Sequence, residues 1–467
     1  MKKLLVMFLA LAASTTAYSQ DCNCVQSLTR LIAKVEKEYP GFGAYSRDKL
    51  AYTSFKDHWL EASKAADEGS CLDILRGYLS YFKHGHISIV QKEEDGRSTH
   101  GAAIDTVDID AEGFREYAAS TKDDLEGIWS SPSYRVGIVK KDDGYVGFII
   151  SSENGSWKPK EIKFLLEHDR KATYFMGDHS PSADEYRLVK GSILWLPENK
   201  VQFVRELPRP QLSSEEIADE LNGLEGLFIR PLSKKTVLLR ISSFDSAYTD
   251  RIKELLAKNA QLLKSHENLI IDVRGNGGGT DYSYQPILPY LYTNPVRHLG
   301  GQYFVTQTLI DSLTTWANDP KNAKYDDVAD VKHDIQRMQG KIGQFIPYST
   351  DGDYGFTRQD SVFASPKSVA ILIDKGAASS TEKFVLDAKQ SKKVKVLGAP
   401  TYGSVDYLSV LVFDFGCDRY VLYMPTVRTS RSEGYPLDNI GVQPDIYMDK
   451  YVDDWVQYAK NYLESSS

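Results

Sequence analysis

The 467-residue chain predicts an α/β core with a mainly parallel sheet, together with an N-terminal helical region and a small antiparallel β domain. Three patterns carry this prediction. Apolar residues recur at helical spacing from Val25 to about Phe82, short β-type runs follow between Leu125 and Arg205, and strand-like and helix-like segments alternate afterwards. A chain of this length with 42% hydrophobic residues can bury roughly two or three domain cores.

The first residues have the pattern of a secretory signal. MKKLLVMFLALAASTTAYSQ combines two lysines, an apolar run of about ten residues and an Ala17-Tyr18-Ser19 step that suits signal peptidase. The apolar run is too short to span a membrane. No L-x-[AG] step precedes Cys22, although this cysteine is near enough to keep lipid anchoring as an alternative. We expect a signal peptide over residues 1–19 and an exported protein, periplasmic or extracellular.

Charge and cysteine content limit the partners and the compartment. The formal net charge of -8 would become -10 on loss of Lys2 and Lys3, and no long basic stretch is present. Nucleic acid is therefore not an expected partner. An oxidising compartment would let the cysteines pair. A bridge from Cys22 or Cys24 to Cys71 would join the N-terminal helices. Four cysteines allow three pairings, and spacing does not choose among them: Cys22, Cys24, Cys71 and Cys417.

Composition shifts divide the chain into segments. A helical region covers residues 20–90 and ends in YFKHGHISIV. An antiparallel β domain is expected over residues 120–208, with a turn at Asp142-Asp143-Gly144 and with Trp129 in its core. The α/β core follows over residues 225–450. Polar, aromatic and helix-like sequence interrupts it at 296–365, which predicts an insertion beside the active-site face that could act as a lid.

The stretch IIDVRGNGGG, residues 270–279, places an apolar strand directly before four glycines in five positions. Thr280 stands where a dinucleotide-binding fingerprint would need another glycine, and the Gly-Lys-Ser/Thr of a P-loop is absent. The sequence therefore predicts no nucleotide site. Backbone N–H groups in such a turn could instead hold a peptide carbonyl or a developing oxyanion.

The stretch GAASSTE, residues 376–382, has two local interpretations. Ser379 and Glu382 have the spacing of a capping box at the start of a helix. A serine at a helix N-terminus also lies where N–H groups and the helix dipole favour a negative charge, which suits attack on a carbonyl. The local sequence leaves both interpretations open.

Four motifs in order give the chain a family resemblance. IIDVRGNGGG, the strand SVAILID followed by KGAASSTE, then VKVLGAPTYGS, and GVQPDI at 441–446 resemble the C-terminal processing (tail-specific) serine peptidases and their tricorn-type relatives. The resemblance covers about residues 230–450, and GHIS at 85–88 is similar to a GHxx segment of that family. It implies a crotonase-like or ClpP-like spiral core, a peptide or protein substrate and no cofactor.

The same resemblance assigns the site residues. Ser379 aligns with the nucleophile, and the backbone N–H of Ser380 with that of Gly277 or Gly278 would form the oxyanion hole. The tail-specific branch has a lysine as base where this chain has Ser404. The tricorn-type branch uses a histidine oriented by an acid, which implies His86 as base and Asp438 as its partner.

Other interpretations remain. Lys383 is one helical turn after Ser379 and is an alternative base. His84 and His86 would share a strand face as a zinc pair, but no HExxH or neighbouring carboxylate accompanies them, so no metal site is predicted. The replaced lysine, together with the β domain in the place of a PDZ domain, also suits a catalytically inactive homologue that binds peptides or apolar ligands. The sequence predicts no oligomeric state.

Overall fold

The computed structural model describes residues 22–465, apart from residues 68, 84, 93–104, 154, 324–327 and 349–353. The expected signal peptide lies outside the described residues. The chain divides into two compact units, one comprising Met1–Lys92, Ser243–Thr249 and Val273–Ser467, and the other Glu93–Ser242 and Asp250–Asp272. In the described part of the chain, no helix is both long and apolar enough to cross a membrane.

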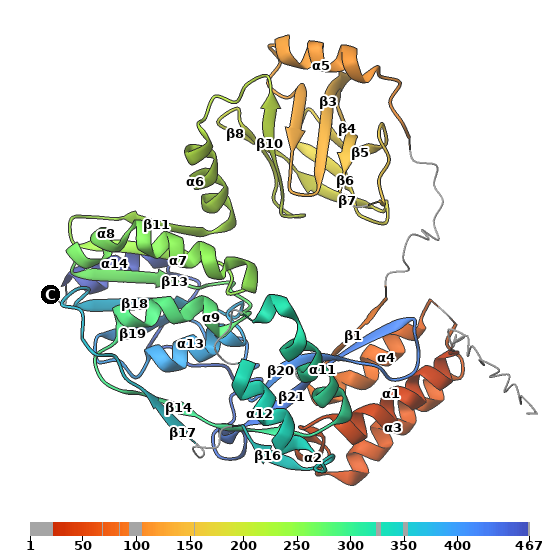
Figure 1. Ribbon diagram of the computed structural model, residues 1–467, viewed down its shortest axis with the longest axis vertical. Helices are drawn as coiled ribbons and strands as arrows, with labels where there is room; N and C mark the ends of the chain where they lie inside the picture. The colour runs from red at the N-terminus through yellow and green to blue at the C-terminus, as the bar shows by residue number, and fades with distance from the viewer. Residues whose placement is uncertain are drawn as a thin grey trace, which may run out of the picture. The chain divides into compact units, whose positions relative to one another are not determined.

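The N-terminal region of the first unit is helical (Figure 1). Its elements are α1 (Cys24–Glu38), α2 (Phe42–Tyr45), α3 (Lys49–Ser63), α4 (Cys71–Leu79) and the 3₁₀ turn η1 (Ser80–Phe82). A reciprocal capping box between Asn23 and Gln26 starts α1. The apolar residues at helical spacing in α1 and α4, among them Leu28, Leu31 and Leu75, are fully buried in one core.

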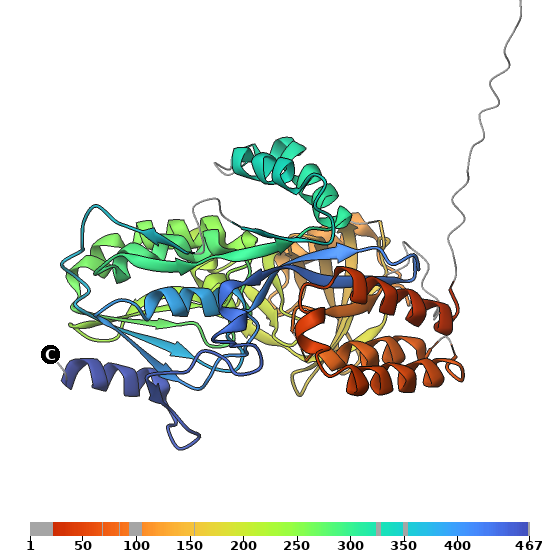
Figure 2. The ribbon, with the colours of Figure 1, turned by 90° about the horizontal axis from the view of Figure 1, so that it is seen from below.

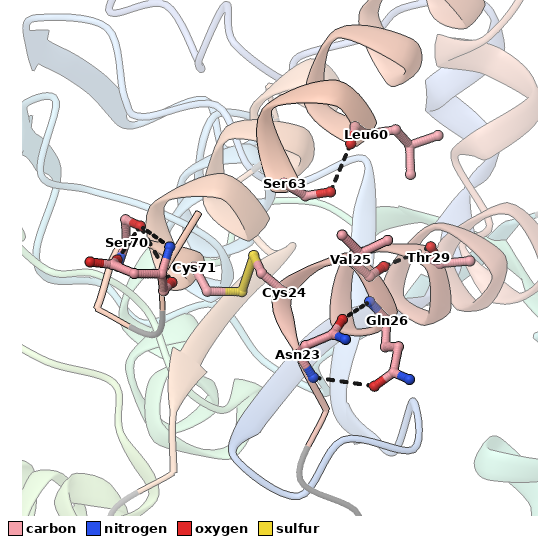
Figure 3. The surroundings of a disulfide bond; sticks show 10 residues. Asn23, Cys24, Val25, Gln26, Thr29, Leu60, Ser63, Ser70 and Cys71 are labelled. Atoms are coloured by element: carbon pink, nitrogen blue, oxygen red, sulfur yellow. Dashed lines mark hydrogen bonds between the residues drawn. A yellow bond between two sulfur atoms is a disulfide. The ribbon is translucent and has the colours of Figure 1, made fainter. Parts of the chain in front are cut away.

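Two disulfides hold this region. Cys24–Cys71 joins α1 to α4 (Figure 3), and Cys22–Cys417 joins the segment before α1 to a distant hairpin. These bonds select one of the three pairings that the sequence leaves open. The hairpin consists of β20 (Tyr407–Phe413) and β21 (Tyr420–Thr429), and both views of the ribbon place it beside the helices (Figures 1 and 2).

An antiparallel sheet connects the helical region to the predicted insertion. β1 (Ser88–Gln91) pairs with β21, with Ser88 opposite Tyr423. Further along the same side, β21 pairs with β15 (Gly301–Phe304), which pairs with β16 (Phe345–Pro347), while β20 pairs with its opposite side. The insertion also contains α11 (Gln307–Asn318), α12 (Val328–Met338) and the strand pair β14 (Val296–Leu299) with β17 (Tyr354–Thr357). Its predicted role as a lid stays a prediction.

Parallel strands carry three of the four sequence motifs in the first unit. β18 (Ser368–Ile373) pairs in parallel with β19 (Val394–Gly398), and β19 pairs in parallel with β22 (Ile446–Tyr447). The crossover from β18 to β19 contains α13 (Ser380–Ala388). The loops at the carboxyl ends of β18 and β19 therefore emerge at the same edge. Short helices α9 (Asp281–Tyr284) and α10 (Leu288–Leu291) precede the insertion, and α14 (Trp455–Ser465) contacts β18.

The second unit contains a nine-stranded antiparallel sheet, whose strands lie within residues 127–207. Its strands are ordered β7-β6-β5-β4-β3-β2-β10-β9-β8, and α5 (Ala111–Ser120) contacts β2. Trp129 on β2 is fully buried and donates its indole N–H to the carbonyl of Leu125 at 2.9 Å, so it lies in the core as expected. The strands are β2 (Gly127–Ser130), β3 (Tyr134–Lys141), β4 (Gly144–Ser152), β5 (Ile162–Glu167), β6 (Lys171–Phe175), β7 (Pro181–Glu185), β8 (Arg187–Val189), β9 (Ile193–Leu196) and β10 (Val201–Leu207).

The second unit also holds the first part of the α/β alternation. β12 (Thr236–Ile241) pairs in parallel with β13 (Asn268–Asp272) and in antiparallel fashion with β11 (Leu227–Pro231). The helices around them are α6 (Ser214–Glu225), α7 (Thr249–Lys258) and α8 (Ala260–Ser265). The chain thus has mixed α/β content with large antiparallel sheets, and the spiral arrangement of its core stays a prediction.

Candidate active site

Ser379 occupies a strained turn between β18 and α13. Its backbone has φ 56° and ψ -119°, a region that residues other than glycine rarely adopt. A sharp strand-to-helix turn of this kind presents a nucleophilic serine at the end of a sheet. Ser379 is partly exposed, whereas the neighbouring Ser380 is 3% exposed and its hydroxyl is buried. The hydroxyl that a substrate can reach is that of Ser379.

The glycine turn after β13 packs directly on this serine. A Cβ atom placed on Gly278 would lie 2.7 Å from the carbonyl oxygen of Ala378 and 2.9 Å from the Cβ of Ser379. Gly278 also has φ 96°, so this position requires glycine for both space and backbone conformation. The N–H of Ala378 donates to the carbonyl of Asn276 at 3.0 Å. Two motifs that are a hundred residues apart in the sequence are therefore joined.

The structure distinguishes the amides proposed for the oxyanion hole. The N–H of Ser380 belongs to the first turn of α13, where N–H groups have no partner within the helix. The N–H of Gly278 donates to Oδ1 of Asn276 at 3.0 Å, so this predicted donor is already engaged in the turn. No hydrogen bond among the described residues uses the N–H of Gly277. Ser380 and Gly277 are the pair of amides that suits an oxyanion.

A buried carboxylate holds the loop of residues 374–379, called the nucleophile loop here after the predicted role of Ser379. Glu382 is completely buried and accepts hydrogen bonds from both sides of the site. One oxygen accepts a hydrogen bond from the Ser379 N–H at 3.0 Å, as the capping-box prediction expects. The two oxygens also receive the Thr401 hydroxyl at 2.5 Å, the Gly403 N–H at 2.9 Å and the Ser404 N–H at 2.8 Å. Glu382 therefore connects the nucleophile loop to the 399–404 loop and is a positioning residue.

Neither Ser404, at the position of the family lysine, nor Lys383 offers an unpaired amine to Ser379. Ser404 is buried and directs its hydroxyl to Glu382 at 3.4 Å. Lys383 forms an ion pair with Asp281. The Lys383 ammonium therefore donates to Asp281, and an ammonium has no lone pair with which to accept a proton from a serine.

His86 is held by a backbone carbonyl. Its Nδ1 lies 2.7 Å from the carbonyl oxygen of Tyr407, the first residue of β20. Because a carbonyl oxygen only accepts, Nδ1 carries the hydrogen, and Nε2 of the neutral ring keeps its lone pair. This is the tautomer that a general base needs.

Tyr402 connects the His86 segment to the nucleophile loop. A Cβ atom on Gly85, the residue before His86, would lie 2.6 Å from the Tyr402 ring. The N–H of Tyr402 donates to the carbonyl of Ala377 at 2.9 Å. The His86 segment, the 399–404 loop and the nucleophile loop are thus in sequential contact.

Asp438 fixes the backbone that precedes Tyr407. Its Oδ1 accepts from the N–H groups of Val405 at 2.8 Å and Asp406 at 2.9 Å, and its own N–H donates to Asp406 at 2.9 Å. Burial, and to a smaller extent the charge of Asp438, raises the pKa of Tyr407 to about 12. The group at Nδ1 of His86 is the Tyr407 carbonyl, so these bonds place Asp438 as a support for that carbonyl.

The fourth motif completes the cluster. The N–H of Val442 donates to the Thr401 hydroxyl at 2.6 Å, and the N–H of Asn439 donates to the carbonyl of Gly403 at 2.9 Å. These contacts therefore link the His86 segment, the glycine turn from residue 273 onward and the other three motifs within the first unit. Across the described residues, no group of three or more His, Cys, Asp or Glu side chains could hold a metal ion, and His84 lies outside those residues.

Comparison with known families identifies the core. Residues 235–448 match the model of peptidase family S41. The α/β core belongs to peptidase family S41. This match confirms the family that the four motifs indicate, and Ser379, the glycine turn and Asp438 fall within the S41 core. His86 lies outside the matched residues.

Solved structures resemble the chain at low identity. The crystal structure of mature CPAF is 12% identical with a TM-score of 0.51, and the match covers 94% of this chain and 96% of that chain. Mature CPAF complexed with lactacystin has the same identity and TM-score, covering 95% and 97%. The tricorn protease is 12% identical with a TM-score of 0.41, covering 95% of this chain and 37% of that chain. The CPAF structures support the fold alone. The comparison with curated proteins found no match.

Sequence reasoning did not find three supporting groups of the S41 site. The Tyr407 carbonyl cannot be recognised from the sequence, because every residue has a backbone carbonyl. Asn276, whose side chain engages Gly278, stands inside the glycine motif, where the pattern indicates only a turn. The wider role of Glu382 requires knowing that residues 401–404 fold against it.

Proposed function

We propose that the protein is an exported serine endopeptidase that hydrolyses peptide bonds of a peptide or protein substrate. The observation that carries the proposal is the strained, accessible Ser379 between β18 and α13, packed against Gly278. Membership of the core in peptidase family S41 supports the reaction class. The two disulfides support export, because such bonds persist in oxidising compartments.

The proposed mechanism assigns a role to each of these groups. The Ser379 hydroxyl attacks the substrate carbonyl while Nε2 of His86 accepts its proton, and the N–H groups of Ser380 and Gly277 stabilise the oxyanion. His86 then returns the proton to the leaving amine, and water releases the acyl group by the reverse sequence. The Tyr407 carbonyl keeps the Nδ1 hydrogen in place and stabilises the imidazolium that forms. No cofactor takes part.

A second candidate is a catalytically inactive homologue that binds peptides or apolar ligands. The observation favouring it is Ser404, which stands at the lysine position and is bound to Glu382 instead of serving the nucleophile. In this case the surface around Ser379 would bind a peptide or an apolar ligand without cleaving it.

Labelling with a fluorophosphonate probe separates the two candidates. An active enzyme should be labelled and should hydrolyse casein, and Ser379→Ala should abolish both. Ser380→Ala is the matched control, because it keeps the backbone amide and removes a buried hydroxyl, so labelling should persist. Lactacystin, bound in one similar structure, can be tested as a competitor of the probe. A folded wild-type protein that the probe does not label would support the binder and contradict the peptidase.

A further inference from the structure

A cavity of about 480 Å³ lies in the first unit, away from the loop that carries Ser379. Its lining includes residues at the starts of β18 and β19, namely Ser368 and Val369 on one strand and the residues around Lys393 on the other. The catalytic loops follow the opposite ends of these strands. Strands of five or six residues separate the two places by roughly 15–20 Å. The cavity is therefore distinct from the Ser379 site.

Four lysines and several apolar side chains share the lining. The lysines are Lys367, Lys392, Lys393 and Lys395. None of the ion pairs recorded between described residues includes the last three, whereas nearby Lys389 pairs with Asp445. In a chain of net charge -8, this concentration of positive charge favours an anion.

Lys393 provides an independent indication of a ligand. Its ammonium nitrogen is buried and has no hydrogen-bond partner among the described residues. Burial lowers the pKa of Lys393 below its ordinary value. A buried charge without a partner is unfavourable, and an anion in the cavity would remove that cost.

The apolar part of the lining indicates the rest of the ligand. Val362, Phe363 and Tyr462 line the same cavity as the lysines, and each keeps part of its side chain exposed. A single small anion would leave most of this volume and these apolar side chains without contact. We propose that the cavity binds a small amphiphilic anion, with its anionic head at Lys393 and its apolar body against these three side chains.

Calorimetric titration of the mature full-length protein with 4-phenylbutyrate tests the proposal. Acetate supplies the head alone and 4-phenylbutanamide the uncharged counterpart, and each should bind at least tenfold more weakly. Lys393→Gln should weaken 4-phenylbutyrate binding at least tenfold. Lys450→Gln removes the same charge from an exposed position outside the cavity and should leave binding unchanged.

Each contrary result overturns a defined part. If acetate binds as tightly as 4-phenylbutyrate, the proposed apolar contact is wrong. If 4-phenylbutyrate binds Lys393→Gln as tightly as wild type, the proposed site is wrong. Absence of binding by wild type overturns the proposal altogether. If Lys393→Gln does not fold, the Lys392→Gln/Lys395→Gln double variant, which changes two exposed side chains, should weaken binding by a similar factor at low salt. Ser379→Ala should bind 4-phenylbutyrate as wild type does, because the two sites are separate.

Discussion

Nδ1 of His86 lies 2.7 Å from the carbonyl oxygen of Tyr407, a residue 321 positions later in the chain. The bond fixes the ring tautomer with a group that no substitution at position 407 removes. The stability of that group depends instead on the backbone around Asp406 and Asp438, where each residue's N–H donates to the other's carboxylate at 2.9 Å. Substitutions at His86 and Asp438 test this dependence. Substitutions at Glu382 and Lys163 test how two buried ionisable side chains contribute to stability.

We expect His86→Ala to lower kcat/KM for peptide hydrolysis by about 10²- to 10⁴-fold, because a positioned general base contributes that much. The rate of fluorophosphonate labelling should fall in parallel. His58→Ala, which removes an exposed histidine from α3, is the control and should match wild type. An unchanged rate in His86→Ala would show that another group accepts the Ser379 proton.

Asp438→Asn should cost less than tenfold in kcat/KM. Asparagine keeps an oxygen that can accept from the N–H groups of Val405 and Asp406, and the Tyr407 carbonyl then stays in place. Asp438→Ala removes both bonds and should cost clearly more. A loss near 10⁴-fold in Asp438→Asn would instead indicate a carboxylate that stabilises the imidazolium directly, as in a serine protease triad. Steady-state hydrolysis of a fluorogenic peptide distinguishes the two.

Glu382→Gln should destabilise the protein by about 2–4 kcal/mol, because hydrogen bonds to buried charged groups are individually strong. The new amide would also direct N–H groups at the donors of Ser379 or Ser404. Urea denaturation measures the change. Glu433→Gln removes an exposed carboxylate paired with Arg428 and should change stability by less than about 1 kcal/mol. Equal effects of the two substitutions would contradict the supporting role of Glu382.

Lys163 should make the β domain sensitive to pH. Its ammonium nitrogen lies 4.0 Å from the centre of the Trp157 ring and donates to the carbonyl of Phe175 at 2.6 Å. Burial lowers the pKa of Lys163 from 10.5 to about 7. Between these values the unfolded chain binds the proton and the folded chain does not, so folding stability rises with pH across this window.

The comparison of wild type with Lys163→Met isolates this contribution. Methionine cannot titrate, so Lys163→Met should have a higher melting temperature than wild type. The difference should be largest at pH 6, at several degrees, as expected for a stability change of a few kcal/mol. The advantage should shrink steadily as pH rises to 9. Thermal scans at these two pH values measure it, and a difference that is independent of pH would show that Lys163 keeps its proton in the folded state.

The sequence predicts those parts of the site in which a side chain or a glycine is irreplaceable. Gly278 and Ser379 are identifiable because they stand in motifs that resemble those of a peptidase family, and the structure adds that a Cβ atom at Gly278 would lie too close to Ala378 and Ser379. The orientation of His86 could not be predicted, because it depends on a carbonyl that any residue at position 407 would supply. The engagement of the Gly278 N–H by Asn276 likewise depends on the path of the turn.

The fold shows the same limits. Helical spacing identifies the buried face of α1 at Leu28 and Leu31, because one helix determines it. The partner of Cys22 was not predictable, because Cys417 comes near only after β20 and β21 pair beside the helices. Long-range pairing of this kind is decided by packing among several elements, and no local pattern records it.

The Cys22–Cys417 bond closes a covalent ring, since the two cysteines are 395 positions apart. A single backbone cut anywhere within that ring leaves both fragments joined. If the peptidase cuts its own chain in the insertion, a non-reducing gel will show one full-size band, and the fragments will separate only after a reductant is added. A nicked molecule could therefore keep His86 and Ser379 attached to each other, and autolysis would become visible only when that bond is broken.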